Sequence, residues 1–451
     1  MFRSVARRRL GALIVAAALA FLCREAHARV RPHYGGEVRV ETSEAEAPDF
    51  IKLLVTETLT SINAGGEAAP ALAVRWEPQN GARRWRFWLR PDVRLHGTDM
   101  DEPLTAALTA NALRAGLAKA GIAARVDASG EVVTVEFDTP MPQFAALLAG
   151  AEFGVGTIDS RGVVVGSGPY AIQSVAPPGM TLVANPDHWA GRRFPETVTV
   201  LCSRSAREQA LDLAAKRADL IEVPPEELRR AQQERSRLSQ MMAAELIVVS
   251  AERAGAGDVR LRRALSESID RAALLNFIFQ KQGEVSGALL PNWITGYGVL
   301  LPAVHDAARA RQLRSEAGAG PQSTLGYEKS DAEMQLLAER IALNARESGI
   351  AVQPVGRTSN VDWLLRRVPV QTANPAAALA GVLRSLHRTV ELNDATLEGV
   401  FRAERAALAD YTAIPLLHLN RAWAAGERLR DWSNASPLTP LPAESWVEGK
   451  P

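Results

Sequence analysis

The sequence predicts an exported α/β protein with more than one domain. Three observations lead to this expectation: strand and helix patterns alternate along the chain, the chain is 451 residues long, and its first residues are basic and then apolar. Single hydrophobic cores stop growing at about 250–300 residues, so a chain of this length is expected to contain two or three domains.

The N-terminal segment has the three parts of a secretory signal peptide. Arg3 and the arginines at 7–9 form a basic region, residues 10–22 are apolar, and Ala26-His27-Ala28 is a small-x-small cleavage site. We expect cleavage of residues 1–28. An uncleaved anchor is the alternative, but the apolar run is shorter than the roughly 18 residues typical of a spanning helix. Arg8-Arg9 also suggests twin-arginine export, but Leu10-Gly11-Ala12 fits that motif poorly, so the ordinary secretory route is favoured.

Composition excludes several classes of function. Loss of residues 1–28 removes five arginines and one glutamate and leaves a net charge near −3, which is not the basic balance of a nucleic-acid-binding protein. Cys202 is then the remaining cysteine, so no intrachain disulfide is expected. The seven histidines are scattered without the spacing of a metal site, and we expect neither metal nor cofactor.

In the N-terminal half, the expected elements are strands at residues 37–41, 85–90 and 132–137 and a helix at residues 104–120. The strands alternate apolar with polar or charged side chains, which is typical of a sheet with one buried face. Trp85, Phe87 and Leu89 share such a face, and Gly121 ends the Ala- and Leu-rich helix. These patterns predict a small α+β subdomain at residues 61–159.

In the C-terminal half, the expected elements are strands at residues 197–202, 219–223 and 350–352 and helices at residues 205–217, 331–347 and from 259 onward. The succession from 197 to 223 predicts a right-handed crossover and a parallel strand pair, with Leu211 on the buried helix face. Asp258 is expected to cap a helix, and Asp270 either continues it or caps a second helix. We expect the tail after Trp432 to form a loose surface segment.

"GSGPY", residues 166–170, could bind phosphate, present a nucleophile or only turn the chain. A phosphate loop leads into a helix, whereas Pro169 removes an amide here and β-like residues follow. A nucleophile elbow needs the frame Gly-x-Ser-x-Gly, which is absent. A structural turn is therefore predicted.

Trp363 with Arg366 and Arg367 has two interpretations. The indole and the guanidinium groups could clamp an anionic ligand, or the indole could be buried with solvated arginines beside it. No serine is followed three residues later by lysine, so the penicillin-recognising type of serine site is also excluded.

Six segments together resemble the family 5 extracellular solute-binding proteins, the peptide- and nickel-binding components of ABC importers. In chain order they are "RPHYGGEVRVET", "PALAVRWEPQNGARRWRFWLRPDVRLHGTDM", "GSGPYAIQSVAPPGMTLVANPDHWAG", "RADLIEVPPEEL", "DVRLRRALSESIDRAALL" and "AIPLLHLNRAW". Their order matches that of the family across nearly the whole mature chain.

The resemblance implies a two-lobed periplasmic-binding-protein fold of type II, peptide-binding-like, with a small additional α+β subdomain. The expected parts are lobe I at residues 29–60, 160–248 and 412–451, the subdomain at 61–159, and lobe II at 249–411. It further implies a monomeric, periplasmic, non-catalytic protein that traps a small solute, oligopeptide-like or other, between the lobes. An ABC permease and its ATPase are the implied partners, and membrane contact is made only through the permease.

This sequence departs from the family where members touch their ligands. The segments "ETSEAEAPDFIKLLVTETL" and "VGRTSNVDWLLRRVPVQTANPAAAL" are compressed, and the acid that would hold a peptide's amino end is missing. Peptide binding and nickel chelation are therefore both unsupported. The alternatives are a ligand-poor periplasmic sensor or interaction module of the same fold and, if distant residues meet in a cleft, a hydrolase.

Six residues are the candidates for solute contact. They are Thr42, Ser43, Trp293, Trp363, Arg366 and Arg367. The aromatic residues would supply contact area, and Arg366 or Arg367 would supply a charged contact to an anion.

Overall fold

The computed structural model of the protein describes residues 31–97, 101–253, 257–318, 322–433 and 435–448. The predicted signal peptide lies outside these residues. Within the described part of the chain, no helix combines the length and apolar character that a membrane span requires. The described residues from Gly35 onward form one compact unit.

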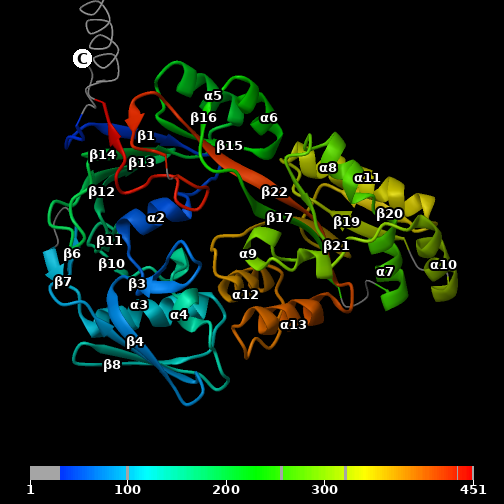
Figure 1. Cartoon of the computed structure of the whole chain (residues 1–451), viewed down its shortest axis with the longest axis horizontal. Helices are drawn as coiled ribbons and strands as arrows, with labels where there is room; N and C mark the ends of the chain where they lie inside the picture. Colours follow the sequence, from blue (N-terminus) through cyan, green and yellow to red (C-terminus); the bar gives the residue numbers. More distant parts are fainter. Residues whose placement is uncertain (1–30, 98–100, 254–256, 319–321, 434, 449–451) are drawn as a thin grey trace, which may run out of the picture. The chain divides into compact units, whose positions relative to one another are not determined.

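A mixed sheet of twelve strands, counted over the described residues, dominates the unit (Figure 1). Ten strands form one path in the order β12 (Tyr170–Ala176), β13 (Gly179–Ala184), β14 (Thr197–Leu201), β1 (Glu37–Glu41), β15 (Leu220–Val223), β22 (Ala413–Ala425), β17 (Met242–Ala251), β21 (Trp363–Pro369), β19 (Ser323–Gly326) and β20 (Val352–Val355). Two more strands, β16 (Arg237–Leu238) and β18 (Gly283–Val285), pair with β22. The long strands β17 and β22 pair with each other in the antiparallel sense and join the two ends of this path.

Smaller sheets lie beside it. One has the order β4 (Ala73–Gln79), β5 (Arg84–Leu89), β9 (Val132–Glu136), β8 (Arg125–Ser129); a second has the order β10 (Gly156–Ile158), β11 (Val164–Gly166), β6 (Arg94–His96), β7 (Asp101–Pro103). Two-stranded pairs are β2 (Thr60–Ile62) with β3 (Ala68–Pro70) and β23 (Leu429–Arg430) with β24 (Trp446–Val447).

Helices pack on both faces of the large sheet, and others pack against the smaller sheets. They are α2 (Asp49–Val55), α3 (Ala106–Lys119), α4 (Phe144–Leu147), α5 (Ala206–Ala214), α6 (Pro225–Gln233), α7 (Val259–Ser268), α8 (Arg271–Phe277), α9 (Asn292–Thr295), α10 (Ala307–Ala317), α11 (Ala332–Glu347), α12 (Pro375–Ser385) and α13 (Leu397–Leu408), with short 3-10 turns η1 (Ala151–Phe153) and η2 (Gly298–Leu300).

Most predicted elements are confirmed. Trp85, Phe87 and Leu89 of β5 are buried in one core cluster with α3 and β9. The question at Asp270 is settled in favour of two helices, because Asp258 accepts a hydrogen bond from Arg260 N at the start of α7 and Asp270 accepts one from Ala273 N at the start of α8.

Three expectations need correction. The strands β14 and β15 are parallel but do not pair with each other, because β1 lies between them and pairs in parallel with both. Leu211 of α5 is 56% exposed, whereas Gln209 and Asp212 are buried on that helix. The tail after Trp432 is not loose: Ala435 and Val447 belong with Trp432 to the core beside α2, and Trp446 is also buried.

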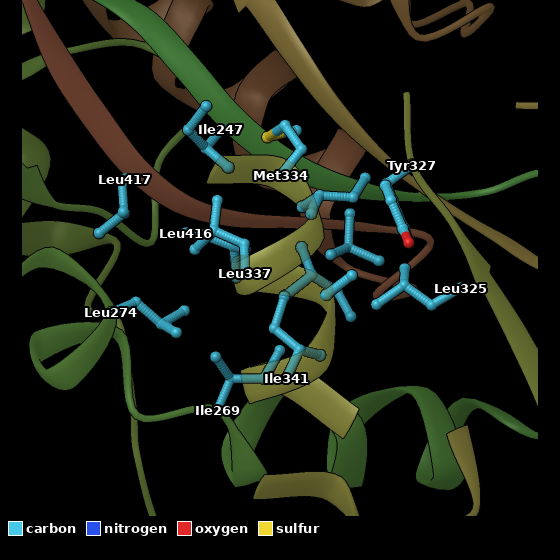
Figure 2. Close-up of a cluster of buried hydrophobic side chains, with 14 of the residues drawn as sticks. Ile247, Ile269, Leu274, Leu325, Tyr327, Met334, Leu337, Ile341, Leu416 and Leu417 are labelled. Carbon is cyan, nitrogen blue, oxygen red and sulfur yellow. The ribbon is translucent and has the colours of Figure 1, made fainter. Parts of the chain in front are cut away.

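The core around α11 shows why this helix forms where the sequence predicts it. Its apolar residues recur every three or four positions, and Met334, Leu337 and Ile341 are almost fully buried. Figure 2 shows these side chains packed against Ile247 of β17 and Leu416 of β22. A large apolar cluster thus fixes one end of the paired strands β17 and β22.

The turn at residues 166–170 is structural, as predicted. A Cβ atom on Gly166 would lie 2.1 Å from the carbonyl oxygen of Val55, and one on Gly168 would lie 2.3 Å from that of Leu54. Only glycine allows the backbone to approach the end of α2 this closely. The turn therefore joins β11 to β12 while packing on α2.

Candidate functional site

The loop after β1 is held by one carboxylate on the neighbouring strand β15. Oε2 of Glu222 accepts hydrogen bonds from Ser43 Oγ at 2.8 Å, from Ser43 N at 3.3 Å and from Thr42 Oγ1 at 3.3 Å. Thr42 is fully buried, and Ser43 is exposed. Because β1 and β15 are parallel neighbours, their carboxyl ends bring these three residues together.

Arg421 of β22 binds the same carboxylate from the other side. Its guanidinium donates to Glu222 Oε1 and lies 3.5 Å from Glu44 Oε1. Burial alone would raise the pKa of Glu222, but Arg421 and the donors of Ser43 outweigh it, and the pKa ends below its ordinary value. Glu222 is therefore ionised at neutral pH.

A second arginine occupies a similar position on β21. Arg367 Nη1 donates to Glu245 Oε2 of β17 at 2.8 Å, and Arg367 Nε donates to Asp331 Oδ2 at 2.7 Å. Asp331 also caps α11 by accepting a hydrogen bond from Met334 N. Burial opposes ionisation of Asp331, but the guanidinium of Arg367 outweighs it and lowers the pKa of this carboxyl.

The two arginines are linked through the strands that cross between the two cores. Alternate residues of a strand lie on one face, and on this face of β22 Leu419 belongs to the core around α11, Trp423 belongs to the core beside α2, and Arg421 lies between them. Glu245 pairs with Leu419 and acts electrostatically on Arg421 as well as on Arg367. A charged zone thus separates two apolar clusters on one face of the sheet.

Glu226, near the start of α6, lies close to this zone. Its Oε2 atom is buried and has no hydrogen-bond partner among the described residues. Burial is the main cause that raises its pKa to about 7, and the nearby carboxylates of Glu333 and Glu245 raise it further. Arg367 opposes this shift without cancelling it.

We name this group the crossing cluster. Its members are Thr42, Ser43, Glu44, Glu222, Glu226, Glu245, Asp331, Arg367 and Arg421. It holds five carboxyl groups and two guanidinium groups, and each guanidinium already binds carboxylates of the chain. No grouping of three or more His, Cys, Asp or Glu side chains suited to a metal ion is found in the part of the chain that the structure describes.

Trp293 of α9 lies beside the crossing strands. Its indole Nε1 donates to the carbonyl oxygen of Ala243 on β17 at 3.0 Å, and the residue is 39% exposed. The hydrogen bond fixes one edge of the ring and leaves part of its surface to solvent. Ala243 is two residues from Glu245, so Trp293 borders the crossing cluster.

Trp363 and Arg366 lie elsewhere. The Trp363 residue is 3% exposed and belongs to the core around α11, so solute contact would require this core to open. Arg366 is on the opposite face of β21 from Arg367 and donates to Ser250 Oγ at 3.0 Å and to Glu252 Oε1 at 2.9 Å. Solute contact by any of the six candidate residues stays a prediction.

Sequence reasoning missed the carboxylates that organise the site and also Arg421. A signal was present: Glu245 and Arg421 are charged residues within largely apolar strands. Charged side chains are almost never buried unless they are paired. Two isolated charges of opposite sign in strands that flank the predicted lobe crossings could therefore have been expected to interact.

Comparisons with known proteins identify the family. The sequence profile of the bacterial extracellular solute-binding proteins, family 5 middle region, matches residues 67–374. A comparison with curated protein sequences gives no match.

Solved structures show the same fold. The ABC transporter-associated periplasmic binding protein DppA from Helicobacter pylori, in complex with the peptide STSA, is similar with a TM-score of 0.78 at 15% identity, over 93% of this chain and 99% of that one. AgaA from A. tumefaciens R10, in complex with agropinic acid, gives 0.76 at 15% identity over 92% and 99%. NikA from Staphylococcus aureus, in complex with Ni(L-His)2, gives 0.74 at 15% identity over 91% and 100%. The fold is thus the two-lobed α/β fold of periplasmic binding proteins, and the chain belongs to the family 5 bacterial extracellular solute-binding proteins.

Proposed function

We propose that the chain is the periplasmic substrate-binding component of an ABC importer and that it binds a small solute at the crossing cluster. The observation that carries this proposal is the composition of the cluster, which gathers polar side chains from the loop after β1 and from β15, β17, β21 and β22, at the strands that join the two apolar cores. Export through a cleaved signal peptide at residues 1–28 is part of the proposal. The permease and ATPase of the importer are the partners, and the chain acts as a monomer.

The lobe bounds are proposed together with this function. They are residues 29–60, 160–248 and 412–451 for lobe I, 61–159 for the subdomain and 249–411 for lobe II. With these bounds the crossing cluster draws Ser43 and Glu222 from lobe I and Arg367 and Asp331 from lobe II. A solute at the cluster would then contact both lobes, as a ligand that drives lobe closure must.

The charge balance of the cluster favours a solute with a positive charge. Arg367 and Arg421 already bind carboxylates, so neither guanidinium is left free to bind an anion. Burial and neighbouring carboxylates raise the pKa values of Glu44 and Glu226. An ammonium or guanidinium group bound beside them would stabilise their ionised forms and lower both pKa values. This proposal differs from the anion contact that the sequence suggested for Arg366 or Arg367.

Hydrogen bonds and aromatic contact would complete the recognition. The exposed Ser43 places its hydroxyl at the edge of the cluster, and the partly exposed indole of Trp293 offers a flat surface near Glu245. A small-molecule site usually combines charged groups, which fix the orientation of the ligand, with an aromatic surface, which supplies contact area. Arg367 would act by holding Glu245 and Asp331 in place.

Native mass spectrometry of the mature protein, purified without unfolding, tests the proposal. A small cationic or zwitterionic molecule that denaturation releases is the expected result. A ligand at 100 times its dissociation constant stabilises the folded state by about 2.7 kcal/mol, so Tm should fall after its removal. Loss of the molecule from a Trp293→Ala variant, with Tyr34→Ala as a surface control, would link it to the site.

The other outcomes have distinct meanings. Release of an anion would contradict the proposed charge class but keep the transport role. A protein that is empty after export and binds no cationic solute would favour a ligand-poor sensor or interaction module. One observation favours that second function: the oxygen atoms of Glu222 and the guanidinium of Arg421 are already bonded within the chain.

A further inference from the structure

Glu41, the last residue of β1, is a buried acid directly before the loop of the crossing cluster. Its side chain is 3% exposed, and its Oε2 atom has no hydrogen-bond partner among the described residues. The nearest cationic atom is Arg204 Nε at 3.6 Å, which is also buried and unpartnered. A buried carboxylate without strong donors is costly, so this geometry favours the neutral acid.

Asp212 of α5 is the anion next to it. Asp212 accepts a hydrogen bond from Arg204 Nη2 at 2.7 Å and another from Arg217 Nε at 2.7 Å. Arg204 therefore lies between the two acids, and interaction with Asp212, as a hydrogen-bond acceptor and as a charge, is among the causes that raise the pKa of Glu41. A hydrogen bond between two carboxyl groups requires a proton on one of them.

The proton resides on Glu41. Burial, followed by the hydrogen bond to Asp212 and its charge, raises the pKa of Glu41 to about 7, although Arg204 opposes the shift. The pKa of Asp212 is instead lowered, chiefly by Arg217 and against the effect of burial. The two groups therefore divide into an acid and an anion at mildly acidic pH.

The charged groups around the pair come from three segments. They are Glu37 and Arg39 on β1, Arg204, Glu208, Asp212 and Arg217 on and beside α5, and Asp219 and Glu222 on and beside β15. Among these, Asp212 and Arg204 are the charges that act on the Glu41 carboxyl. The pKa of Glu41 is thus affected by one anion, Asp212 of α5, and by one cation, Arg204, which precedes α5 and binds Asp212.

The start of α5 also holds the loop of the crossing cluster. Arg204 N donates to Thr42 O at 2.9 Å, and Ser203 N donates to Glu44 O at 2.8 Å. Gln209 of α5 accepts a hydrogen bond from Glu222 N at 2.9 Å. A repulsion between Glu41 and Asp212 would therefore push apart the segments that fix both the loop and Glu222.

We propose that Glu41 is a positioning residue: one proton shared with Asp212 holds the loop at residues 42–44 in place, and loss of this proton loosens the loop. At higher pH both carboxyl groups are ionised, and the loop opens more often. The effect on solute affinity rests on the proposed function, whereas the effect on the loop does not. Binding would then be tighter at mildly acidic pH than at mildly alkaline pH.

Hydrogen exchange of residues 42–44 and 203–204 tests the proposal on protein freed of solute. The measured rates are first corrected for the intrinsic pH dependence of exchange. The opening equilibrium constant of the wild-type loop should then increase about tenfold from pH 6 to pH 8, if opening returns Glu41 to its ordinary pKa. In Glu41→Gln, the amide keeps a neutral donor for Asp212, and this increase should vanish. The control Glu37→Gln, on the same strand, should behave as wild type because Glu37 is paired with Arg39 and has a lowered pKa.

A flat wild-type profile, or an equal pH response in Glu41→Gln, would overturn the proposal. If Glu41→Gln does not fold, Asp212→Asn gives an independent test, since Glu41 then keeps only Arg204 and its pH response should move to lower pH. An unchanged profile in Asp212→Asn would also overturn it. Absence of any solute would affect the proposed function alone, because the exchange measurement uses none.

Discussion

Arg421 of β22 and Glu222 of β15 lie on neighbouring antiparallel strands, and the guanidinium of the first binds the carboxylate of the second. The same carboxylate accepts the donors of Ser43, so a single ion pair connects the loop after β1 to the crossing strands. The side chains are only 23% and 11% exposed. This connection is the structural basis for the first prediction.

Arg421→Met should destabilise the folded protein by about 2–4 kcal/mol. Removal of one partner leaves a buried carboxylate uncompensated, and the partial exposure of the pair keeps the cost below that of a fully buried pair. Urea unfolding measures the difference. The double variant Arg421→Met with Glu222→Gln should recover part of the loss, because no unpaired charge then stays buried.

A surface pair provides the control for this prediction. Arg430 and Glu448 are bonded but are 46% and 41% exposed, so Arg430→Met should cost less than about 1 kcal/mol. Equal losses for the two arginine variants would show that Arg421 does not stabilise the fold through charge pairing.

The regular elements could be predicted because their signals are local. β5 alternates buried with partly exposed residues along the strand, and α11 repeats its buried residues every three or four positions. The place of β1 between β14 and β15 could not be predicted, because it depends on a pairing across about 160–180 positions of the chain. Packing of the C-terminal tail was missed for a related reason: Trp432 is buried by contacts with distant residues.

The candidate site was only partly predictable. Thr42, Ser43, Trp293 and Arg367 lie at or beside the crossing cluster, since a position after a strand or near a lobe crossing can be read from sequence. Arg366 and Arg367 were both chosen beside Trp363, but successive residues of a strand face opposite sides, and Trp363 itself is buried in the core around α11. The carboxylate partners became visible only when β15, β17 and β21 were placed beside β22.

Gly168→Ala should destabilise the protein by about 2 kcal/mol or more. The added methyl group would lie 2.3 Å from the carbonyl oxygen of Leu54, and backbone cannot move aside as a flexible side chain can. Gly381→Ala is the matched control in α12, where the nearest atom lies 4.0 Å away and a helical alanine should stabilise by roughly 0.5–1 kcal/mol. Thermal unfolding of both variants measures the contrast, and a tolerated Gly168→Ala would contradict the close approach.

Glu44→Gln should weaken binding of a cationic solute about three- to tenfold, because a partly exposed charge contact contributes on the order of 1 kcal/mol. Glu46→Gln, in the same loop and exposed, is the control and should bind as wild type. Titration of the solute released from the purified protein gives both dissociation constants. Tighter binding by Glu44→Gln would indicate an anionic solute and would refute the charge class proposed here.

The free energy of unfolding should fall as pH rises from about 4.5 to 7, and Glu226 should contribute about 1–3 kcal/mol of this change. Its ordinary pKa of 4.5 is raised to about 7 in the folded protein, mainly by burial. Between these values the folded state holds a proton that the unfolded state has lost, so higher pH favours unfolding. The loss of stability becomes complete only above pH 7, where Glu226 is also ionised in the folded protein, and stability changes little with pH below the ordinary pKa.

Glu226→Gln separates this contribution from that of other acids, because a neutral amide cannot titrate. The variant should be more stable than wild type at pH 8 and should differ little from it at pH 4.5, as judged by urea unfolding at both values. Glu227→Gln is the control on the same helix turn, since this neighbouring side chain is 43% exposed and binds Arg230. An identical pH slope for wild type and Glu226→Gln would show that the buried carboxyl near Glu333 and Glu245 is not held neutral, and the electrostatic argument for a cationic solute would lose its main support.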